Sequence, residues 1–271
     1  MRTARPVALV TGASSGIGKA AAQALVEAGF DVVGTSRNSA QVTDRGDLTY
    51  VDLDVASDES VDAAVQEVID RFGRIDVLVN NAGIGSTGAA EESSVAQAHR
   101  VFDVNVFGVF RMTNAVLPYM RAQCGGRIVN VSSVVGFVPA PYMAVYAATK
   151  HAIEGYSESV DHEVRDQGIR VILVQPAFTK TGFEANALEP DGPMPMYATQ
   201  RQVFDTVLAA AMERGDEPAV VGRAVVAAAT DRKPKLRYTA GPTAGRVSTL
   251  RRVVPARAFD KQIRKLNRLA G

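Results

Sequence analysis

The chain has 271 residues, of which 46% are hydrophobic and 22% charged, and its formal net charge at pH 7 is +1. This is ordinary globular composition, and the single cysteine excludes an intramolecular disulfide. The three histidines show no metal-ligand spacing, so no metal site is predicted. The amino-terminal residues lack a secretory signal pattern, and no apolar run approaches the roughly 20 residues of a membrane span. We therefore expect a protein of the reducing cytoplasm.

Valine-rich apolar stretches alternate with helix-like stretches along most of the chain. Strands are predicted at residues 6–10, 31–36, 48–55, 75–83, 125–133, 168–176 and 235–241. Helices are predicted at residues 19–29, 56–73, 92–123 and 143–167, the third as two helices that meet near Val104 to Gly108. This alternation predicts an α/β fold with a Rossmann-type doubly wound, mostly parallel sheet and helices on both faces.

Two segments depart from the alternation. Residues 177–204 contain prolines, glycines and scattered apolar side chains, and so long a connection predicts a substrate lid. The last residues are strongly basic and predict a pair of helices. We divide the chain into a nucleotide-binding domain at residues 1–241, which includes the lid, and a C-terminal helical extension at residues 242–271.

The stretch TGASSGIG stands directly between the first predicted strand and the first predicted helix. Glycines at Gly12, Gly16 and Gly18 permit a tight turn and let the backbone approach a pyrophosphate. The amino end of the helix offers N–H groups and a positive dipole to the same phosphates. The strand before and the helix after this loop supply the context that a dinucleotide-binding motif requires.

The end of the second strand indicates which dinucleotide is bound. An acid about 20 residues after the glycines would bind the ribose 2′-hydroxyl of NAD. Here Thr35, Ser36 and Arg37 occupy that region. A guanidinium can form a forked pair with a 2′-phosphate. Arg37 therefore predicts NADP(H), with a solvated loop charge as the alternative.

A candidate catalytic group lies between residues 132 and 150. Tyr146 and Lys150 are four residues apart and share a helix face. A phenol has an ordinary pKa near 10, and a nearby ammonium would favour its ionised form. Ser133 ends a predicted strand, where ligands gather in α/β sheets, and its hydroxyl could hold a substrate oxygen.

Several of these motifs occur together and in one order, with NNAG at 80–83, Asn105 in FDVNVFG, Ser133 in NVSS and YAATK at 146–150 following TGASSGIG. With them the chain resembles the short-chain dehydrogenase/reductase family over roughly residues 5 to 240. Its C-terminal extension resembles that of the 17-beta-hydroxysteroid and retinol dehydrogenase-like group. The resemblance implies an NADP(H)-dependent oxidoreductase that interconverts a ketone or aldehyde and an alcohol by hydride transfer.

The resemblance also implies individual roles. Tyr146 would be the acid/base, Lys150 would lower its pKa and bind the nicotinamide ribose, and Ser133 would polarise the carbonyl. Asn105 would sit at a helix irregularity and hold a water that links Lys150 to solvent. The implied cofactor contacts are Gly12, Ser14, Ser15, Gly16, Ile17, Gly18, Arg37, Asp54, Val55, Asn81, Ala82, Gly83, Tyr146, Lys150, Pro176, Thr179 and Thr181. Pro176-Ala177 replaces the Pro-Gly that is frequent in the family, and alanine is the less permissive residue.

The predicted substrate pocket is apolar. Its expected lining is Val134, Phe137, Tyr142, Phe178 and Phe183. Such a lining favours a small lipophilic carbonyl or alcohol. A 3-oxoacyl thioester reductase or a general carbonyl reductase is the alternative, and a catalytically silent NADP sensor is the alternative outside enzymes. The resemblance further implies a homodimer or homotetramer formed through the helices near 105–123 and 143–167.

The C-terminal charge is unevenly distributed. From Arg232 onward the sequence has 12 Lys or Arg residues and one acid, Asp260, whereas the rest has 18 basic and 28 acidic residues. No nucleic-acid-binding motif accompanies these charges, so no nucleic acid partner is predicted. Three interpretations of the tail stay open: helices with solvated charge, docking on an acidic protein surface, and contact with anionic lipid.

Overall fold

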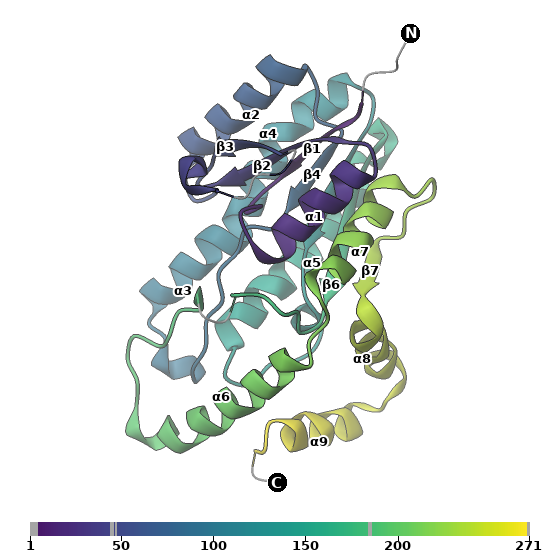
Figure 1. The fold of residues 1–271 in the computed structure, drawn as a ribbon. Coiled ribbons are helices and arrows are strands. Elements are labelled where there is room, and N and C mark those ends of the chain that lie inside the picture. The colour runs from purple at the N-terminus through teal and green to yellow at the C-terminus, as the bar shows by residue number, and fades with distance from the viewer. Residues whose placement is uncertain (1–4, 44–45, 47, 184–185, 270–271) are drawn as a thin grey trace.

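Seven parallel strands form the sheet at the centre of the computed structural model, which describes residues 5–43, 46, 48–183 and 186–269 (Figure 1). Their order is β3-β2-β1-β4-β5-β6-β7. The strands are β1 (Val7–Val10), β2 (Asp31–Ser36), β3 (Thr49–Asp52), β4 (Val77–Asn80), β5 (Gly126–Val131), β6 (Ile169–Pro176) and β7 (Arg237–Ala240). Every residue of β1 and β4 is buried, as expected for central strands covered on both faces.

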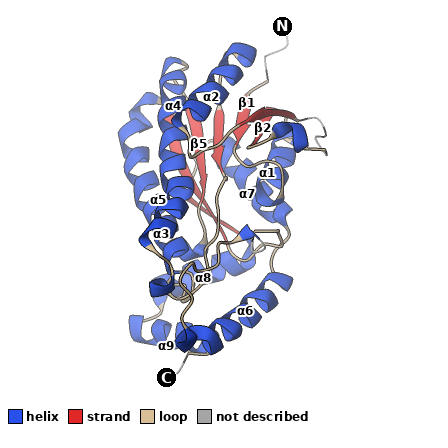
Figure 2. Cartoon of the chain, turned by 90° about the vertical axis from the view of Figure 1, so that its left-hand side faces the viewer, coloured by secondary structure: helices blue, strands red, loops and turns tan. Residues whose placement is uncertain are grey.

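Helices cover both faces of this sheet (Figure 2). On one face lie α1 (Gly16–Glu27) and α7 (Pro218–Thr230), whose Leu25 and Val225 are fully buried in the core. The other face is covered by α2 (Asp58–Phe72), α4 (Gly108–Ala122) and α5 (Ala144–Val164). The predicted doubly wound α/β fold is confirmed, and the sheet is parallel at every described pairing.

Shorter helices fill the connections. They are η1 (Ser39–Gln41), η2 (Ala90–Glu92), α3 (Val95–Phe102), η3 (Asp103–Phe107), η4 (Val134–Gly136), η5 (Arg165–Gln167) and η7 (Pro195–Tyr197). The element η3 is a turn of π-helix between α3 and α4. It lies where the sequence predicts two helices to meet.

The direction in which the sheet is built reverses beside β1, which lies between β2 and β4. In open parallel sheets, ligands bind outside the carboxyl ends of the strands at such a reversal. The motifs TGASSGIG, NNAG and NVSS lie at the carboxyl ends of β1, β4 and β5 respectively. The topology therefore brings three motifs that are distant in sequence to one edge of the sheet.

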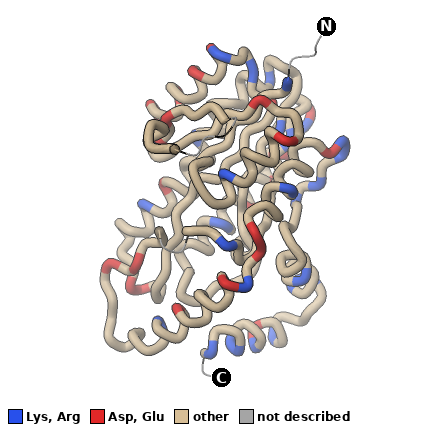
Figure 3. Tube along the Cα trace, viewed as in Figure 1, with Lys and Arg blue, Asp and Glu red and all other residues tan. Residues whose placement is uncertain are grey.

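Two helices of the C-terminal third, α6 (Ala198–Glu213) and α9 (Ala256–Leu266), lie lowest in Figure 1. Helix α6 (Ala198–Glu213) begins inside the predicted lid, of which residues 184–185 lie outside the described part. Helices α8 (Gly241–Val253) and α9 (Ala256–Leu266) follow β7, and Figure 3 shows Lys and Arg along α9. Among the described residues no helix is both long and apolar enough to cross a membrane.

Candidate active site

The glycine-rich loop after β1 has the backbone that its sequence predicts. Gly12 and Gly16 adopt positive φ angles of 65° and 54°, a conformation that glycine reaches without steric cost. A Cβ on Gly18 would lie 2.9 Å from the Gly12 carbonyl carbon and still closer to the Asn81 side chain. Ser15 is the N-cap of α1 but makes no side-chain cap bond, so N–H groups of the first turn stay available to a phosphate.

Asn81 fixes this loop from the neighbouring strand end. Its Nδ2 donates to the Thr11 carbonyl at 3.0 Å and to the Gly12 carbonyl at 3.2 Å. The Thr11 hydroxyl accepts from the backbone N–H groups of Asn81 and Ala82, each at 2.9 Å. The adjacent Gly83 packs on Asn105, whose Oδ1 would lie 3.2 Å from an added Cβ. These hydrogen bonds and close packing contacts hold the loop in place, as expected for a loop that binds a pyrophosphate.

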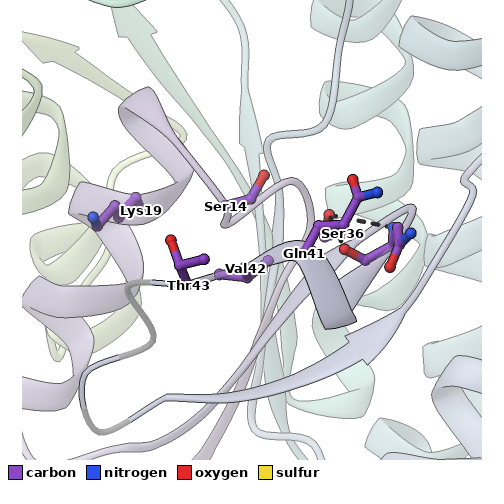
Figure 4. Close-up of a pocket in the computed structure, with 7 residues that line it drawn as sticks. Ser14, Lys19, Ser36, Gln41, Val42 and Thr43 are labelled. Carbon is purple, nitrogen blue, oxygen red and sulfur yellow. Dashed lines mark hydrogen bonds between the residues drawn. The ribbon is translucent and has the colours of Figure 1, made fainter.

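A polar cavity of about 390 Å³ opens between this loop and the end of β2 (Figure 4). Its lining comprises Ser14, Lys19, Ser36, Asn38, Gln41, Val42 and Thr43. Lys19 in α1 and the residues after Asn38 were missed from the sequence, because no motif marks them. Arg37 is exposed and lies between the lining residues Ser36 and Asn38.

The two predicted adenine contacts lie after β3. Asp54 is exposed, and its Oδ1 accepts from the Ala56 N–H at 3.0 Å. Val55 is buried at 7% exposure, and its carbonyl accepts from Arg111 at 3.2 Å. The Asp54 carboxylate thus already supports its own turn, and its contact with adenine stays a prediction.

Tyr146 and Lys150 lie on one face of α5 and are both buried, at 9% and 8% exposure. The Lys150 Nζ donates to the Val131 carbonyl of β5 at 2.9 Å and lies 5.6 Å from the centroid of the Tyr146 ring. Burial lowers the pKa of Lys150 to about 8, because charging a desolvated ammonium is costly, while the Glu154 carboxylate opposes that shift. Burial raises the pKa of Tyr146. This direction is opposite to the lowering that Lys150 alone would produce.

Ser133 begins the loop that runs from β5 towards α5. Its Oγ lies 3.5 Å from the Pro176 carbonyl and accepts from the Val135 N–H at 3.3 Å. Pro176 ends β6, the neighbouring strand. The strand-end serine and the segment that begins at Pro176 are therefore side by side.

Asn105 lies in the π-helical turn η3 and is buried at 2% exposure. Its side chain exchanges two hydrogen bonds of 2.8 Å with the backbone of Ile84. Its Nδ2 also donates to the Thr149 hydroxyl at 3.2 Å, and that hydroxyl donates to the Tyr146 carbonyl at 2.7 Å. Asn105 thus reaches the tyrosine turn of α5 through Thr149, and the predicted water towards Lys150 stays a prediction.

The predicted substrate residues separate into two groups. The Phe183 ring lies 5.4 Å from the Tyr146 ring, and Val134 is buried beside Ser133. Tyr142 packs on Phe204 of α6, with ring centroids 5.7 Å apart. Phe137 is half-buried, with its carbonyl bonded to Arg251, and Phe178 is 43% exposed. The structure therefore places Phe183 beside Tyr146 and leaves Phe178 at the surface.

The segment after β6 contacts the glycine-rich loop. An added Cβ on Gly16 would lie 3.2 Å from the Thr181 methyl group. The Thr179 hydroxyl donates to the Ala177 carbonyl at 3.1 Å, and the residue itself is buried. Thr181 is thus placed beside the predicted cofactor cradle, and the contact of Thr179 with the cofactor stays a prediction.

The rest of the predicted lid is anchored at Glu92, a residue that the sequence did not single out. Glu92 is 1% exposed and forms an ion pair with Arg201 of α6. Its Oε1 also accepts from the Met194 N–H at 2.7 Å, and its backbone carbonyl accepts from the Gly192 N–H at 2.9 Å. No local pattern reveals such contacts, since Glu92 and Arg201 are 109 residues apart.

Comparison with known proteins shows the family of this chain. The sequence matches the short chain dehydrogenase family over residues 6–191. It is 39% identical to a 3-ketodihydrosphingosine reductase of Bacteroides thetaiotaomicron over 238 residues, which covers 87% of this chain and 88% of that protein.

Solved structures show the same fold over the whole chain. A short-chain dehydrogenase from Streptomyces avermitilis is 34% identical and superposes with a TM-score of 0.84 over 99% of both chains. A short chain dehydrogenase/reductase from Burkholderia phymatum in complex with NAD is 27% identical, with a TM-score of 0.81 over 97% of this chain and 96% of that one. Motifs, site geometry and similarity together show that the chain belongs to the short-chain dehydrogenase family of oxidoreductases.

Proposed function

We propose that this protein is an NADP(H)-dependent oxidoreductase that interconverts a ketone or aldehyde and an alcohol on a lipophilic substrate. The observation that carries the proposal is the buried Tyr146, whose ring lies 5.6 Å from the Lys150 Nζ and 5.4 Å from the Phe183 ring. A proton donor close to both an ammonium and an apolar ring suits the reduction of a carbonyl in an apolar molecule.

The residues of the glycine-rich loop fit the phosphates of a dinucleotide. The loop packs so closely against Asn81 that a side chain on Gly18 would clash with it. When bound, NADPH supplies a hydride to the carbonyl carbon of the substrate. Ser133 orients the carbonyl oxygen through its hydroxyl. Tyr146 donates its phenolic proton to that oxygen, which yields the alcohol.

The two pKa shifts have complementary effects on this proton transfer. Burial raises the pKa of Tyr146, so the phenol holds its proton at neutral pH. Lys150, with a pKa of about 8, is charged below that pH. Its positive charge stabilises the phenolate that remains after the proton has moved. We therefore expect the reduction to be favoured below about pH 8.

Arg37 and its surroundings support NADP(H) as the cofactor. The polar cavity beside Arg37 has the ammonium of Lys19 and three hydroxyl groups in its lining, and cationic and hydroxyl groups suit a 2′-phosphate. The Burkholderia phymatum neighbour was solved with NAD, so the fold alone does not choose between the two cofactors. The choice rests on the residues at the end of β2.

The substrate class follows from the apolar residues at Tyr146 and from a relative. Val134 and Phe183 beside the catalytic residues favour an apolar carbonyl compound. A relative at 39% identity is named 3-ketodihydrosphingosine reductase, and a long-chain ketone of that kind agrees with such a wall. A 3-oxoacyl thioester is the second candidate substrate, since it also joins a ketone to an apolar chain.

The test is NADPH oxidation with a panel of ketones. The panel holds 3-ketodihydrosphingosine, a steroid ketone, a 3-oxoacyl thioester and a small charged keto acid. We expect turnover on at least one lipophilic member, higher efficiency with NADPH than with NADH, and no turnover on the keto acid. Higher efficiency with NADH would refute the cofactor assignment. Binding of NADPH without turnover on any member would favour the silent sensor.

The long helices α4 and α5 support a homo-oligomer. Phe110 of α4 stacks on Tyr156 of α5, with ring centroids 4.0 Å apart, and Phe107, the last residue of η3 before α4, is 44% exposed. Light scattering in solution measures the assembly, and a monomer at micromolar concentration would contradict it.

The basic C-terminal helices contact their own subunit. Arg251 donates to the Phe137 carbonyl at 3.2 Å, and Gln200 of α6 donates to the Asn267 carbonyl at 3.2 Å. These contacts support the interpretation of the tail as helices that pack beside the predicted lid and keep their charges in solvent. Sedimentation with anionic vesicles at low salt tests lipid contact, which absence of binding would eliminate.

A further inference from the structure

Helix α5 carries a third ionisable residue in line with the two catalytic ones. Glu154 follows Lys150 by four residues, as Lys150 follows Tyr146, so the three side chains share one face of the helix. Glu154 is 7% exposed. A carboxylate buried to that degree is rare unless it is paired, and the step that transfers the proton does not involve it.

Two side chains from two strands fix the Glu154 carboxylate. Gln175 of β6 donates its Nε2 to Oε1 at 2.9 Å, and Arg237 of β7 donates its Nε to Oε2 at 2.9 Å. Arg237 also pairs with Glu158 at 3.1 Å, whose side chain is 48% exposed. The cluster therefore contains two carboxylates and one guanidinium, so one negative charge is not neutralised within it.

Glu154 also packs against the loop that carries Ser133. A Cβ on Gly136 would lie 3.0 Å from the Glu154 Cγ, 2.8 Å from the Ser132 hydroxyl and 3.2 Å from the Lys150 carbonyl. The loop after β5 thus lies directly on the turn of α5 between Lys150 and Glu154. A shift of the Glu154 side chain would therefore disturb both the loop that carries Ser133 and the turn that carries Lys150.

We propose that Glu154 is a positioning residue of the active site, whose fixed negative charge favours the ammonium form of Lys150 and so supports the proton donor Tyr146. The inference rests on the proposed function, because it assigns Glu154 a part in the same reaction. It also makes Gln175 and Arg237 the residues that hold this charge in place.

The groups around Lys150 support this assignment. Burial lowers the pKa of Lys150, and the Glu154 carboxylate is the charge that opposes the shift. On its own helix Lys150 faces the Tyr146 phenol, which stays neutral. From β5 it meets the neutral Val131 carbonyl. Arg237 of β7 bonds to Glu154, and the exposed Glu158 bonds to the same Arg237.

A purely structural role for the cluster is the competing explanation, and matched variants separate the two. Glu154→Gln keeps the shape of the side chain and removes its charge. Glu158→Gln removes the other carboxylate that pairs with Arg237 and leaves Glu154 in place. Both variants weaken the anchoring of β7, and urea unfolding measures that loss. Only Glu154→Gln should shift the basic limb of the pH profile for NADPH-dependent reduction, by about one pH unit to lower pH.

A second measurement needs no turnover. Lysine labelled with ¹³C at Cε gives an NMR signal for each of the seven lysines, and loss of a signal in Lys150→Met assigns that of Lys150. We expect its titration midpoint to fall in Glu154→Gln and to stay unchanged in Glu158→Gln. Arg237→Gln leaves the Glu154 charge without its guanidinium partner, so the midpoint should rise in that variant.

These outcomes separate this inference from the proposed function. An equal Lys150 midpoint in wild type, Glu154→Gln and Arg237→Gln would overturn the inference even if the protein reduces ketones. A wild type that reduces no ketone would overturn the proposed function, while the opposite midpoint shifts would still show that Glu154 sets the charge of Lys150. If Glu154→Gln does not fold, the rise expected in Arg237→Gln decides the question alone.

Discussion

Replacement of Lys150 by methionine should make the chain without nucleotide more stable, although it removes a catalytic residue. Lys150 is 8% exposed, and its ammonium makes a hydrogen bond to the Val131 carbonyl. Methionine has a similar length, fills irregular core space and carries no charge to desolvate. The variant therefore replaces a buried charge with an apolar side chain of comparable size.

The magnitude follows from the pKa of Lys150. Its value of about 8 in the folded chain, against an ordinary 10.5, corresponds to about 3 kcal/mol of stability lost at neutral pH. Loss of the hydrogen bond to Val131 removes about 1 kcal/mol from the gain. We expect Lys150→Met to raise the free energy of unfolding by about 2 kcal/mol at pH 7.

The stability difference between the variant and the wild type should depend on pH. Between about pH 8 and 10.5 the unfolded lysine binds more protons than the folded one, so the wild type becomes more stable as the pH rises. The variant has no group that titrates at this position, so its gain in the free energy of unfolding over the wild type should shrink across the same pH range. By pH 10 the cost of the buried ammonium should fall to about 1 kcal/mol.

Urea unfolding at pH 7 and pH 10, followed by circular dichroism, measures both values. Lys180→Met is the control, because Lys180 is 46% exposed in its surface pair with Glu217 and should show little pH-dependent difference. If Lys150→Met is less stable than the wild type by an equal amount at both pH values, the reasoning from burial is refuted.

Four further variants test the site. Tyr146→Phe should lower turnover by about 100-fold or more and leave NADPH affinity unchanged in a fluorescence titration; near-normal turnover would contradict its role as proton donor. Gly18→Ala should abolish NADPH binding measured by calorimetry, because its Cβ would meet the Gly12 carbonyl and Asn81. Arg37→Glu should lower the ratio of efficiencies with NADPH and NADH by about 100-fold, and an unchanged ratio would leave Arg37 a solvated charge. Arg201→Met should speed limited proteolysis between residues 186 and 197, since it removes the ion pair with Glu92; an unchanged cleavage rate would show that the other contacts suffice.

Much of the fold was predictable because its signals are local. Buried parallel strands appear as valine-rich stretches, and a glycine-rich turn between a strand and a helix identifies a phosphate-binding loop. The predicted strand 75–83 nevertheless ends at Asn80 in the structure. Asn81 lies beyond the strand, and its side-chain amide donates to the Thr11 and Gly12 carbonyls. Residues 205–230, for which the sequence analysis gave no element, form the end of α6 and all of α7.

The sequence by itself determined the α/β alternation, the cofactor loop and the catalytic pair, since spacing within one helix or turn fixes which side chains share a face. Only the tertiary structure decided which partners surround that pair. Glu154 meets Gln175 and Arg237 across 21 and 83 residues of sequence, and Phe183 reaches the Tyr146 ring from the predicted lid. Burial reversed the pKa shift predicted for Tyr146, because desolvation depends on the whole packed environment and not on the neighbour four residues away.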